Sequence, residues 1–170
     1  MKDITIHDNL FSNEQIDKFR NFLLYNCQFD YGERDNLNSP PCGLVCDFTE
    51  RDESLHPNFD IILKSLLSKI FEQHEQLKKS KIQSVYLNLF LPRETPQFHT
   101  DGEDTITCLC YLNPRLNYNE GGETQFIIDD EIKGVISKPG RLVVFNGKLL
   151  HRATSFLTQP RLTLAFKFQR

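Results

Sequence analysis

The chain has 170 residues, 39% of them hydrophobic with 14 Phe, and a formal net charge of -3. This length fits one domain with one core, and the apolar content is too high for a disordered chain. Because the net charge is negative, the chain has no excess of basic residues that would favour binding to nucleic acid. Lys78, Lys79 and Lys81 could still form a local basic strip, although a solvated helix end explains them equally well. We expect a single domain over residues 1–170 and no nucleic-acid partner.

The first residues and the cysteines bear on the compartment. Residues 1–8 are polar and charged with no apolar segment after them, so we expect no signal peptide, and no apolar run is long enough to span a bilayer. The five cysteines, an odd number, fit free thiols in a reducing compartment. Cys42 and Cys46 have roughly finger-like spacing, but no second Cys/His pair completes a zinc site. We therefore expect a cytoplasmic protein without a membrane partner.

The N-terminal part contains helix signals. Ser12 stands where an N-cap would, with Gln15 three residues later as in a capping box. Apolar residues at helical spacing follow, so the sequence predicts a helix over residues 13–25 after a short strand over 4–10. A second helix is predicted from near Pro57, a good first-turn residue, with its apolar stripe fading near Lys79. The helical region thus covers about residues 12–79.

Residues 29–50 separate the two predicted helices. The segment carries Gly, Asn, Asp and Ser and the pair Pro40-Pro41, which is loop chemistry. Long loops in compact domains often act as lids or binding segments. A substrate lid and a plain surface loop both remain open at this point.

The hydrophobic period changes to two after Ser80. Short strands are predicted at 82–91, 106–112, 123–128, 134–137, 141–145 and 162–168, separated by turn residues. Short strands at regular spacing indicate an antiparallel sandwich or barrel. The predicted fold class is mostly β with flanking α-helices, with the β core over about residues 82–168.

Two histidines and one aspartate form a candidate metal site. In an extended segment the side chains of His99 and Asp101, two residues apart, point to the same face. His151 follows a later strand and turn, and a separate strand of the same barrel could bring it close to His99 and Asp101. Two His and one carboxylate on one face of an octahedron are characteristic of non-haem Fe(II) oxygenases. Alone, His-x-Asp is a common chance match, and a lone His beside a strand is more often structural.

Arg161 opens the last predicted strand, ten residues after His151. It shares one strand face with Thr163, while Leu162 lies on the other face. An arginine inside a barrel is costly unless a carboxylate meets it, and a bidentate pair with a ligand carboxylate would do so. An exposed arginine at the start of a strand is the alternative.

In combination these residues resemble the Fe(II)- and 2-oxoglutarate-dependent dioxygenases, and within them the prolyl 4-hydroxylase branch. The resemblance covers roughly residues 82–168. It rests on the metal triad with Arg161, on Ile106 to Asn113 followed by Gly121-Gly122-Glu123-Thr124, and on Lys138 to Phe145. A family tyrosine near Phe90 is missing. Collagen-type members carry lysine where this chain has Arg161, which favours the hypoxia-sensing or bacterial type.

The resemblance implies a double-stranded β-helix, or jelly-roll, with the metal at its open end. It implies that His99, Asp101 and His151 ligate Fe(II) and are catalytic through it. Arg161 would pair with the C5 carboxylate of 2-oxoglutarate, and Tyr111 would donate its hydroxyl to the same group. The resemblance also implies that the strand before His99 provides a polar contact to the cosubstrate, and Asn88 is the best candidate on that strand. Thr163 is a further candidate because it shares a strand face with Arg161.

The implied reaction hydroxylates a C–H bond with O2 while 2-oxoglutarate becomes succinate and CO2, and ascorbate is a further candidate cofactor. The implied substrate is a prolyl residue in a peptide or protein. Alternatives are a free amino acid, another small molecule, an alkylated base, or a catalytically silent β-barrel binding protein, because fold alone does not set function. The substrate, the hydroxylated position and the oligomeric state do not follow from the sequence.

Overall fold

A computed structural model describes residues 3–32, 40–49, 59–113 and 117–170. The N-terminal elements are β1 (Ile4–His7), α1 (Asn13–Asn26), β2 (Asp30–Tyr31), β3 (Leu44–Asp47), α2 (Asp60–Gln73) and a 3-10 helix, η2 (Glu75–Lys79). The remaining strands are β4 (Ile82–Phe90), β5 (Thr105–Tyr111), β6 (Thr124–Ile128), β7 (Glu131–Val135), β8 (Leu142–Asn146), β9 (His151–Ala153) and β10 (Arg161–Gln169).

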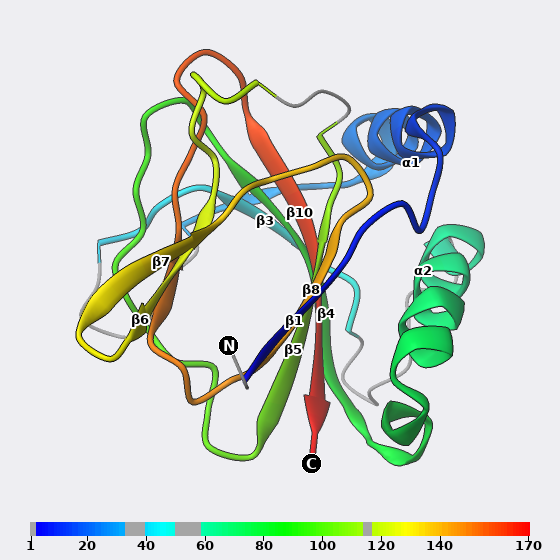
Figure 1. The fold of residues 1–170 in the computed structure, drawn as a ribbon. Helices are drawn as coiled ribbons and strands as arrows, with labels where there is room; N and C mark the ends of the chain where they lie inside the picture. The colour runs from blue at the N-terminus through cyan, green and yellow to red at the C-terminus, as the bar shows by residue number, and fades with distance from the viewer. Residues whose placement is uncertain (1–2, 33–39, 50–58, 114–116) are drawn as a thin grey trace.

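The strands form two antiparallel sheets that face each other (Figure 1). The larger sheet has the order β1-β8-β5-β10-β4-β3-β2, and the smaller has the order β7-β6-β9. The long central strand β10 pairs with β4 on one side and with β5 on the other. The fold is mostly β with two helices and a jelly-roll core, which confirms the predicted fold class.

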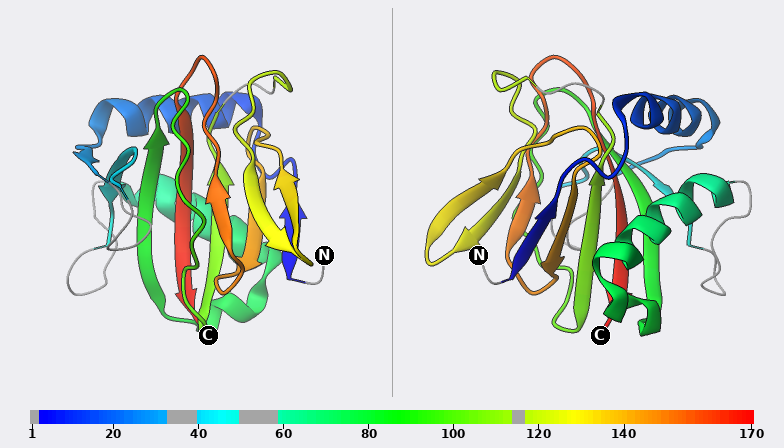
Figure 2. Two further views of the ribbon diagram at one scale, coloured as in Figure 1. Left: turned by 90° about the vertical axis from the view of Figure 1, so that its left-hand side faces the viewer. Right: turned by 45° about the vertical axis from the view of Figure 1, so that its right-hand side comes forward.

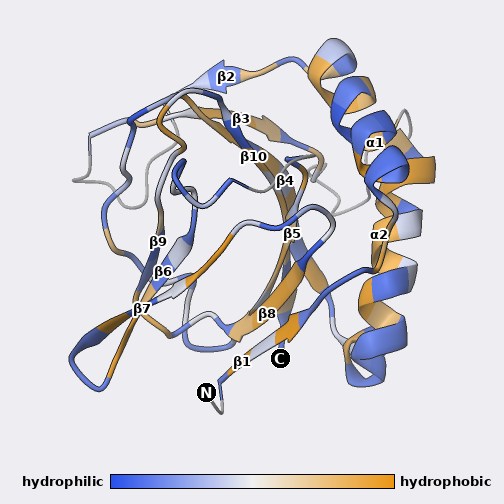
Figure 3. Ribbon diagram, turned by 45° about the horizontal axis from the view of Figure 1, so that its top comes forward, coloured by the Kyte–Doolittle hydropathy of each residue, from blue (hydrophilic) through white to orange (hydrophobic). Residues whose placement is uncertain are grey.

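Both helices lie on the outer face of the larger sheet, on the side away from the smaller one (Figure 2). The capping box predicted at Ser12 and Gln15 is present at the start of α1. The helices are amphipathic (Figure 3), and their apolar residues pack on the outward-facing residues of the sheet. From β10 these outward residues are Leu162, Leu164, Phe166 and Phe168.

The alternate residues of the same strands face the space between the sheets. Leu109, Tyr111 and Ala165 belong to this second, inner cluster, with Phe126 from the smaller sheet and Phe145 from β8. Because successive side chains alternate across a strand, the apolar packing of Leu162 under the helices obliges Arg161 and Thr163 to point inward. The packing of the helices on the outer face of the sheet thereby fixes which polar side chains point into the space between the two sheets.

The structure departs from the predicted elements in a few places. The segment 29–50, predicted as loop, contains β2 and β3, and β3 pairs with β4 in the larger sheet. Its residues 33–39 and 50, and the predicted helix start at Pro57, lie outside the described residues, and a substrate lid stays a prediction. The strand predicted at 134–137 instead covers Glu131–Val135, because Asp129 and Asp130 both take positive φ and form a tight turn directly after β6.

Within the described ranges, no helix is long and apolar enough to cross a membrane. A single domain over residues 1–170 stays a prediction.

Candidate active site

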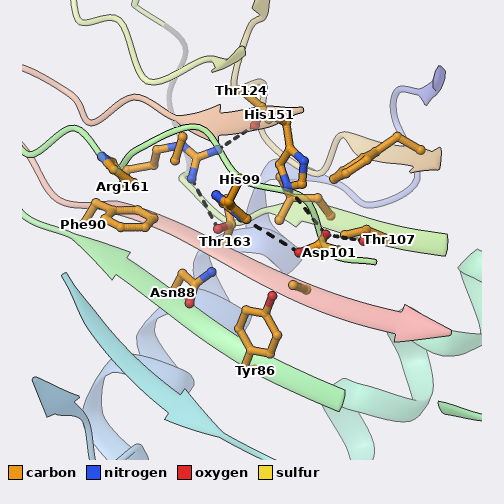
Figure 4. A pocket seen from close by; sticks show the side chains of 15 residues that line it. Tyr86, Asn88, Phe90, His99, Asp101, Thr107, Thr124, His151, Arg161 and Thr163 are labelled. Atoms are coloured by element: carbon orange, nitrogen blue, oxygen red, sulfur yellow. Dashed lines mark hydrogen bonds and ion pairs between the residues drawn. The ribbon is translucent and has the colours of Figure 1, made fainter. Parts of the chain in front are cut away.

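His99, Asp101 and His151 come together between the two sheets. Their ligand atoms all lie within 4.8 Å of one another. The His99 Nε2 atom is 3.8 Å from one oxygen of Asp101, and the His151 Nε2 atom is 3.5 Å from the other. Figure 4 shows both imidazoles directed at this carboxylate. Two neutral nitrogen donors and one anionic oxygen donor can hold a divalent ion on one face and leave positions open for other ligands.

Backbone pairing brings these three residues together across fifty positions of the chain. His99 and His151 form an antiparallel bridge, in which each amide N–H donates to the other residue's carbonyl at 2.9 Å. The Asp101 amide donates to the carbonyl of Gly147 at 2.7 Å. The segment before β5 therefore runs beside β9 and extends the smaller sheet.

Each histidine is oriented through its second ring nitrogen. His151 Nδ1 lies 2.7 Å from the carbonyl of Leu149, and His99 Nδ1 lies 3.2 Å from the carbonyl of Gln97. Because a carbonyl only accepts, we assign the proton to Nδ1 in both rings, which leaves the Nε2 lone pairs facing Asp101. Burial lowers the pKa of His151 to about 4, although Asp101 acts to raise it. A neutral ring at neutral pH is the form that binds metal.

Asp101 is buried and held by two further side chains. Its carboxylate is only 2% exposed, accepts a 2.5 Å hydrogen bond from the Thr107 hydroxyl and contacts the Lys167 ammonium at 2.7 Å. Burial alone would raise the pKa of Asp101, but Lys167, His151 and the Thr107 hydrogen bond outweigh it and hold the pKa below its ordinary value. The carboxylate is therefore ionised and ready to act as an anionic ligand.

A cavity connects the three residues with Arg161. Among the residues that line it are Asn88, Phe90, Thr124, Arg161 and Thr163, together with His99, Asp101 and His151. Arg161 is 1% exposed, which excludes the alternative of an exposed arginine. Its guanidinium donates to the carbonyl of Gly122 at 3.0 Å and to the Thr124 hydroxyl at 2.9 Å. The fork is thus fixed in orientation at the end of the cavity away from Asp101 (Figure 4).

Tyr111 lies behind the residues that line the cavity and does not line it itself. Its hydroxyl is 2.5 Å from the Thr124 hydroxyl and also donates to the carbonyl of Val135 at 3.3 Å. Thr124 in turn accepts from Arg161. The structure therefore places a second hydroxyl, that of Thr124, between Tyr111 and the cavity. Thr124 was not singled out as a site residue from sequence; it stands two residues beyond Gly122, whose carbonyl Arg161 meets.

Asn88 and Thr163 are cross-strand partners on β4 and β10. Both are buried and both line the cavity, and the Thr163 hydroxyl lies 3.4 Å from a guanidinium nitrogen of Arg161. Phe90, where a family tyrosine was missing, also lines the cavity with its apolar ring. All the residues singled out from sequence are therefore at the cavity except Tyr111, which is one hydroxyl removed.

No family model and no curated protein matches the sequence. Solved structures do match. A prolyl-4-hydroxylase from Pseudomonas putida is 16% identical, with a TM-score of 0.66 over 98% of this chain and 92% of that one. An oxidoreductase of the 2OG-Fe(II) oxygenase family from Burkholderia pseudomallei is 11% identical, with a TM-score of 0.74 over 99% of this chain and 85% of that one.

This chain has the 2OG-Fe(II) oxygenase fold. HygX from Streptomyces hygroscopicus, whose structure holds nickel and 2-oxoglutarate, has a TM-score of 0.68 at 13% identity, with 98% of this chain and 82% of that one covered. At these identities the likeness establishes the shared fold.

Two side chains that contact Asp101 were not identified from sequence as functional. Thr107 and Lys167 both touch Asp101, and they are cross-strand neighbours on β5 and β10. Thr107 precedes Tyr111 by four residues and Lys167 follows Arg161 by six, so both stand at inward positions of their strands. Strand alternation was thus the available signal.

Proposed function

We propose that this protein is an Fe(II)- and 2-oxoglutarate-dependent dioxygenase that hydroxylates a C–H bond. The observation that supports the proposal best is one cavity with two chemically distinct ends. Three convergent ligands, His99, Asp101 and His151, stand at one end, and the buried guanidinium of Arg161 stands at the other. This arrangement suits a diacid that reaches a metal with one end and an arginine with the other.

In this proposal His99, Asp101 and His151 would hold Fe(II), which would supply the oxidising chemistry of a reaction that converts 2-oxoglutarate and O2 to succinate and CO2. The chain's own residues bind and orient. The carbonyls of Gln97 and Leu149 hold the two imidazoles, and Thr107 and Lys167 hold the Asp101 carboxylate.

The cosubstrate end is built for a carboxylate. Arg161 would meet the C5 carboxylate with its planar fork, while Thr124 and Thr163 offer hydroxyls beside it. Asn88 faces the same space across the strand pair. We propose that Tyr111 orients the Thr124 hydroxyl at the cosubstrate end of the cavity, since the two hydroxyls are hydrogen-bonded.

For the substrate we propose a prolyl residue in a peptide or protein. Its support is the fold shared with a bacterial prolyl-4-hydroxylase and the sequence resemblance over residues 82–168. The same chemistry on a free amino acid or another small molecule is the alternative. A cytoplasmic location and a role for ascorbate stay predictions.

The test measures metal and cosubstrate binding before turnover. We expect the protein to bind one Fe(II) or Ni(II) per chain and then 2-oxoglutarate by calorimetry under anaerobic conditions. Asp101→Ala should abolish metal binding, whereas Asp104→Ala, which removes an exposed carboxylate three residues on, should not. Arg161→Met should weaken 2-oxoglutarate binding while leaving metal binding intact.

A matched control for Arg161→Met is Arg141→Met. Arg141 is also largely buried, but it pairs with Asp8 and does not line the cavity. With the ligands bound, succinate formation is then followed with proline-containing peptides and with free proline. A protein that binds neither metal nor 2-oxoglutarate would be a silent β-barrel binding protein, and the proposal would be wrong.

A further inference from the structure

Lys167 is a second cation on the inward face of β10. It stands six residues beyond Arg161 on the same face of the strand, which at the rise of an extended chain separates the two backbones by about 20 Å. The Asp101 carboxylate lies at the Lys167 end. In the proposed function Arg161 meets one carboxylate of the five-carbon diacid and the metal meets the other, so cosubstrate binding does not call on Lys167.

The two cations also differ in access. The Lys167 side chain is 21% exposed, whereas Arg161 is 1% exposed. The Lys167 end of the strand face, where the ammonium contacts Asp101, is therefore more open to solvent than the Arg161 end.

The ammonium retains hydrogen-bonding capacity. It contacts one oxygen of Asp101 at 2.7 Å and lies 5.0 Å from the centre of the Tyr86 ring, whose hydroxyl is its second partner. These are its partners among the residues that the structure describes, while an ammonium has three N–H bonds. One donor therefore remains for a ligand.

The cavity lies beside Asp101 and Tyr86, the two residues that the Lys167 ammonium contacts. Ala165 is the inward residue of β10 before Lys167, and its cross-strand neighbours Tyr86 and Leu109 line the cavity with it. Figure 4 shows the Tyr86 hydroxyl directed toward Asp101. Around Ala165 the wall is apolar at Leu109 and polar at the Tyr86 and Thr107 hydroxyls, so it suits a small carbon skeleton with one polar end.

The charges balance only with an additional anion. This step rests on the proposed function. The two positive charges of Fe(II) are met by Asp101 and by the carboxylate of 2-oxoglutarate that faces the metal, and Arg161 meets the other carboxylate. Lys167 then keeps its own charge in a largely buried site, because its partner Asp101 serves the metal. A cation in such surroundings is stabilised by an anionic partner.

We propose that Lys167 and Tyr86 bind a carboxylate of the substrate next to the C–H bond that is hydroxylated. The substrate is then a residue that carries its own α-carboxylate. It is either the C-terminal residue of a peptide, which narrows the prolyl substrate proposed above, or a free amino acid, which is its alternative. An internal residue of a polypeptide has no such group. Lys167 is a specificity-determining residue in this assignment, and Tyr86 orients its ammonium.

The experiment compares matched acids and amides on the metal- and 2-oxoglutarate-loaded protein. A panel of L-amino acids, led by proline, is offered as free acids and as amides. Peptides with a C-terminal proline are offered as acids and as C-terminal amides, and peptides with internal proline are included. Anaerobic binding and aerobic succinate formation are both measured. Because each variant is scored by its acid-to-amide ratio, a loss of metal affinity cancels.

We expect at least one acid to bind and react, with an acid-to-amide ratio of about tenfold or more in the wild type. The ratio should fall to near one in Lys167→Met, and Lys167→Arg should restore part of it. Lys64→Met, a lysine on the outer surface of α2, is the matched control and should keep the wild-type ratio. The free-acid and C-terminal arms identify which source of carboxylate the site takes.

Three outcomes overturn the assignment: amides or internal residues that react as well as acids, an acid preference that persists in Lys167→Met, and no response to any acid. A Lys167→Met variant that binds the metal more weakly but keeps its acid preference at saturating metal would assign Lys167 to positioning Asp101 only. Failure of the proposed function is distinguishable, since it would appear earlier as absence of metal or 2-oxoglutarate binding in the wild type.

Discussion

The hydrogen bond from Thr107 to Asp101 is open to a nearly isosteric test. Both side chains are about 2% exposed, and the hydroxyl donates to the carboxylate at 2.5 Å. Thr107→Val keeps the shape and the β-branch but removes the donor. A hydrogen bond to a buried charged group is worth about 1.5–3 kcal/mol, because water cannot replace the lost partner.

Two measurements follow from that magnitude. At neutral pH the metal-free Thr107→Val variant should lose about 1.5–3 kcal/mol in its free energy of unfolding, measured by urea denaturation. Its affinity for Fe(II) or Ni(II), measured by anaerobic calorimetry, should fall about tenfold to a hundredfold, since partners of ligating carboxylates hold them in place. Thr107→Ser keeps the hydroxyl and should stay close to wild type in metal affinity. If Thr107→Val binds the metal as tightly as the wild type, the reasoning about how Asp101 is held is refuted.

Three further substitutions or conditions test other parts of the structure. In Gly122→Ala the new Cβ would lie 2.3 Å from the Phe156 ring, at a backbone φ of +79°. We therefore expect the free energy of unfolding, measured by heat or urea, to fall by roughly 2–4 kcal/mol. A change within the error of the measurement would contradict this. Phe166→Ala should lower the free energy of unfolding by about 3–5 kcal/mol in the same assay, because Phe166 is fully buried under the helices. A loss as small as that of a surface substitution would count against the core assignment. The hydrogen bonds from Arg141 hold the pKa of Asp8 below its ordinary value, so this pair should stabilise the fold above about pH 4 and lose that contribution as the pH falls further. Asp8→Asn should flatten this part of the pH profile of the free energy of unfolding. An unchanged profile would refute the pairing.

Local patterns in the sequence determined the elements and the orientation of their side chains. The alternation along residues 161–168 places Arg161 and Thr163 on one face and leucine and phenylalanine on the other, and the packing of α2 on the outer face bears this out. The Ser12 capping box was likewise legible, since a cap depends on a few neighbouring residues. Fold class followed from the same signals, because the period of the hydrophobic pattern differs between helix and strand.

Contacts between distant residues were decided by the tertiary structure. The sequence nominated His99, Asp101 and His151 as candidates, but only the bridge between His99 and His151 brings their ligand atoms together. Tyr111 matched a family motif, yet its hydroxyl reaches Thr124 and not the cavity, because β6 passes in front of it. Lys167 looked like one more polar strand residue until the pairing of β10 with β5 set it beside Asp101 and Thr107. Alternation tells which way a side chain points, whereas its partner across the barrel depends on strand order and register, which local sequence does not encode.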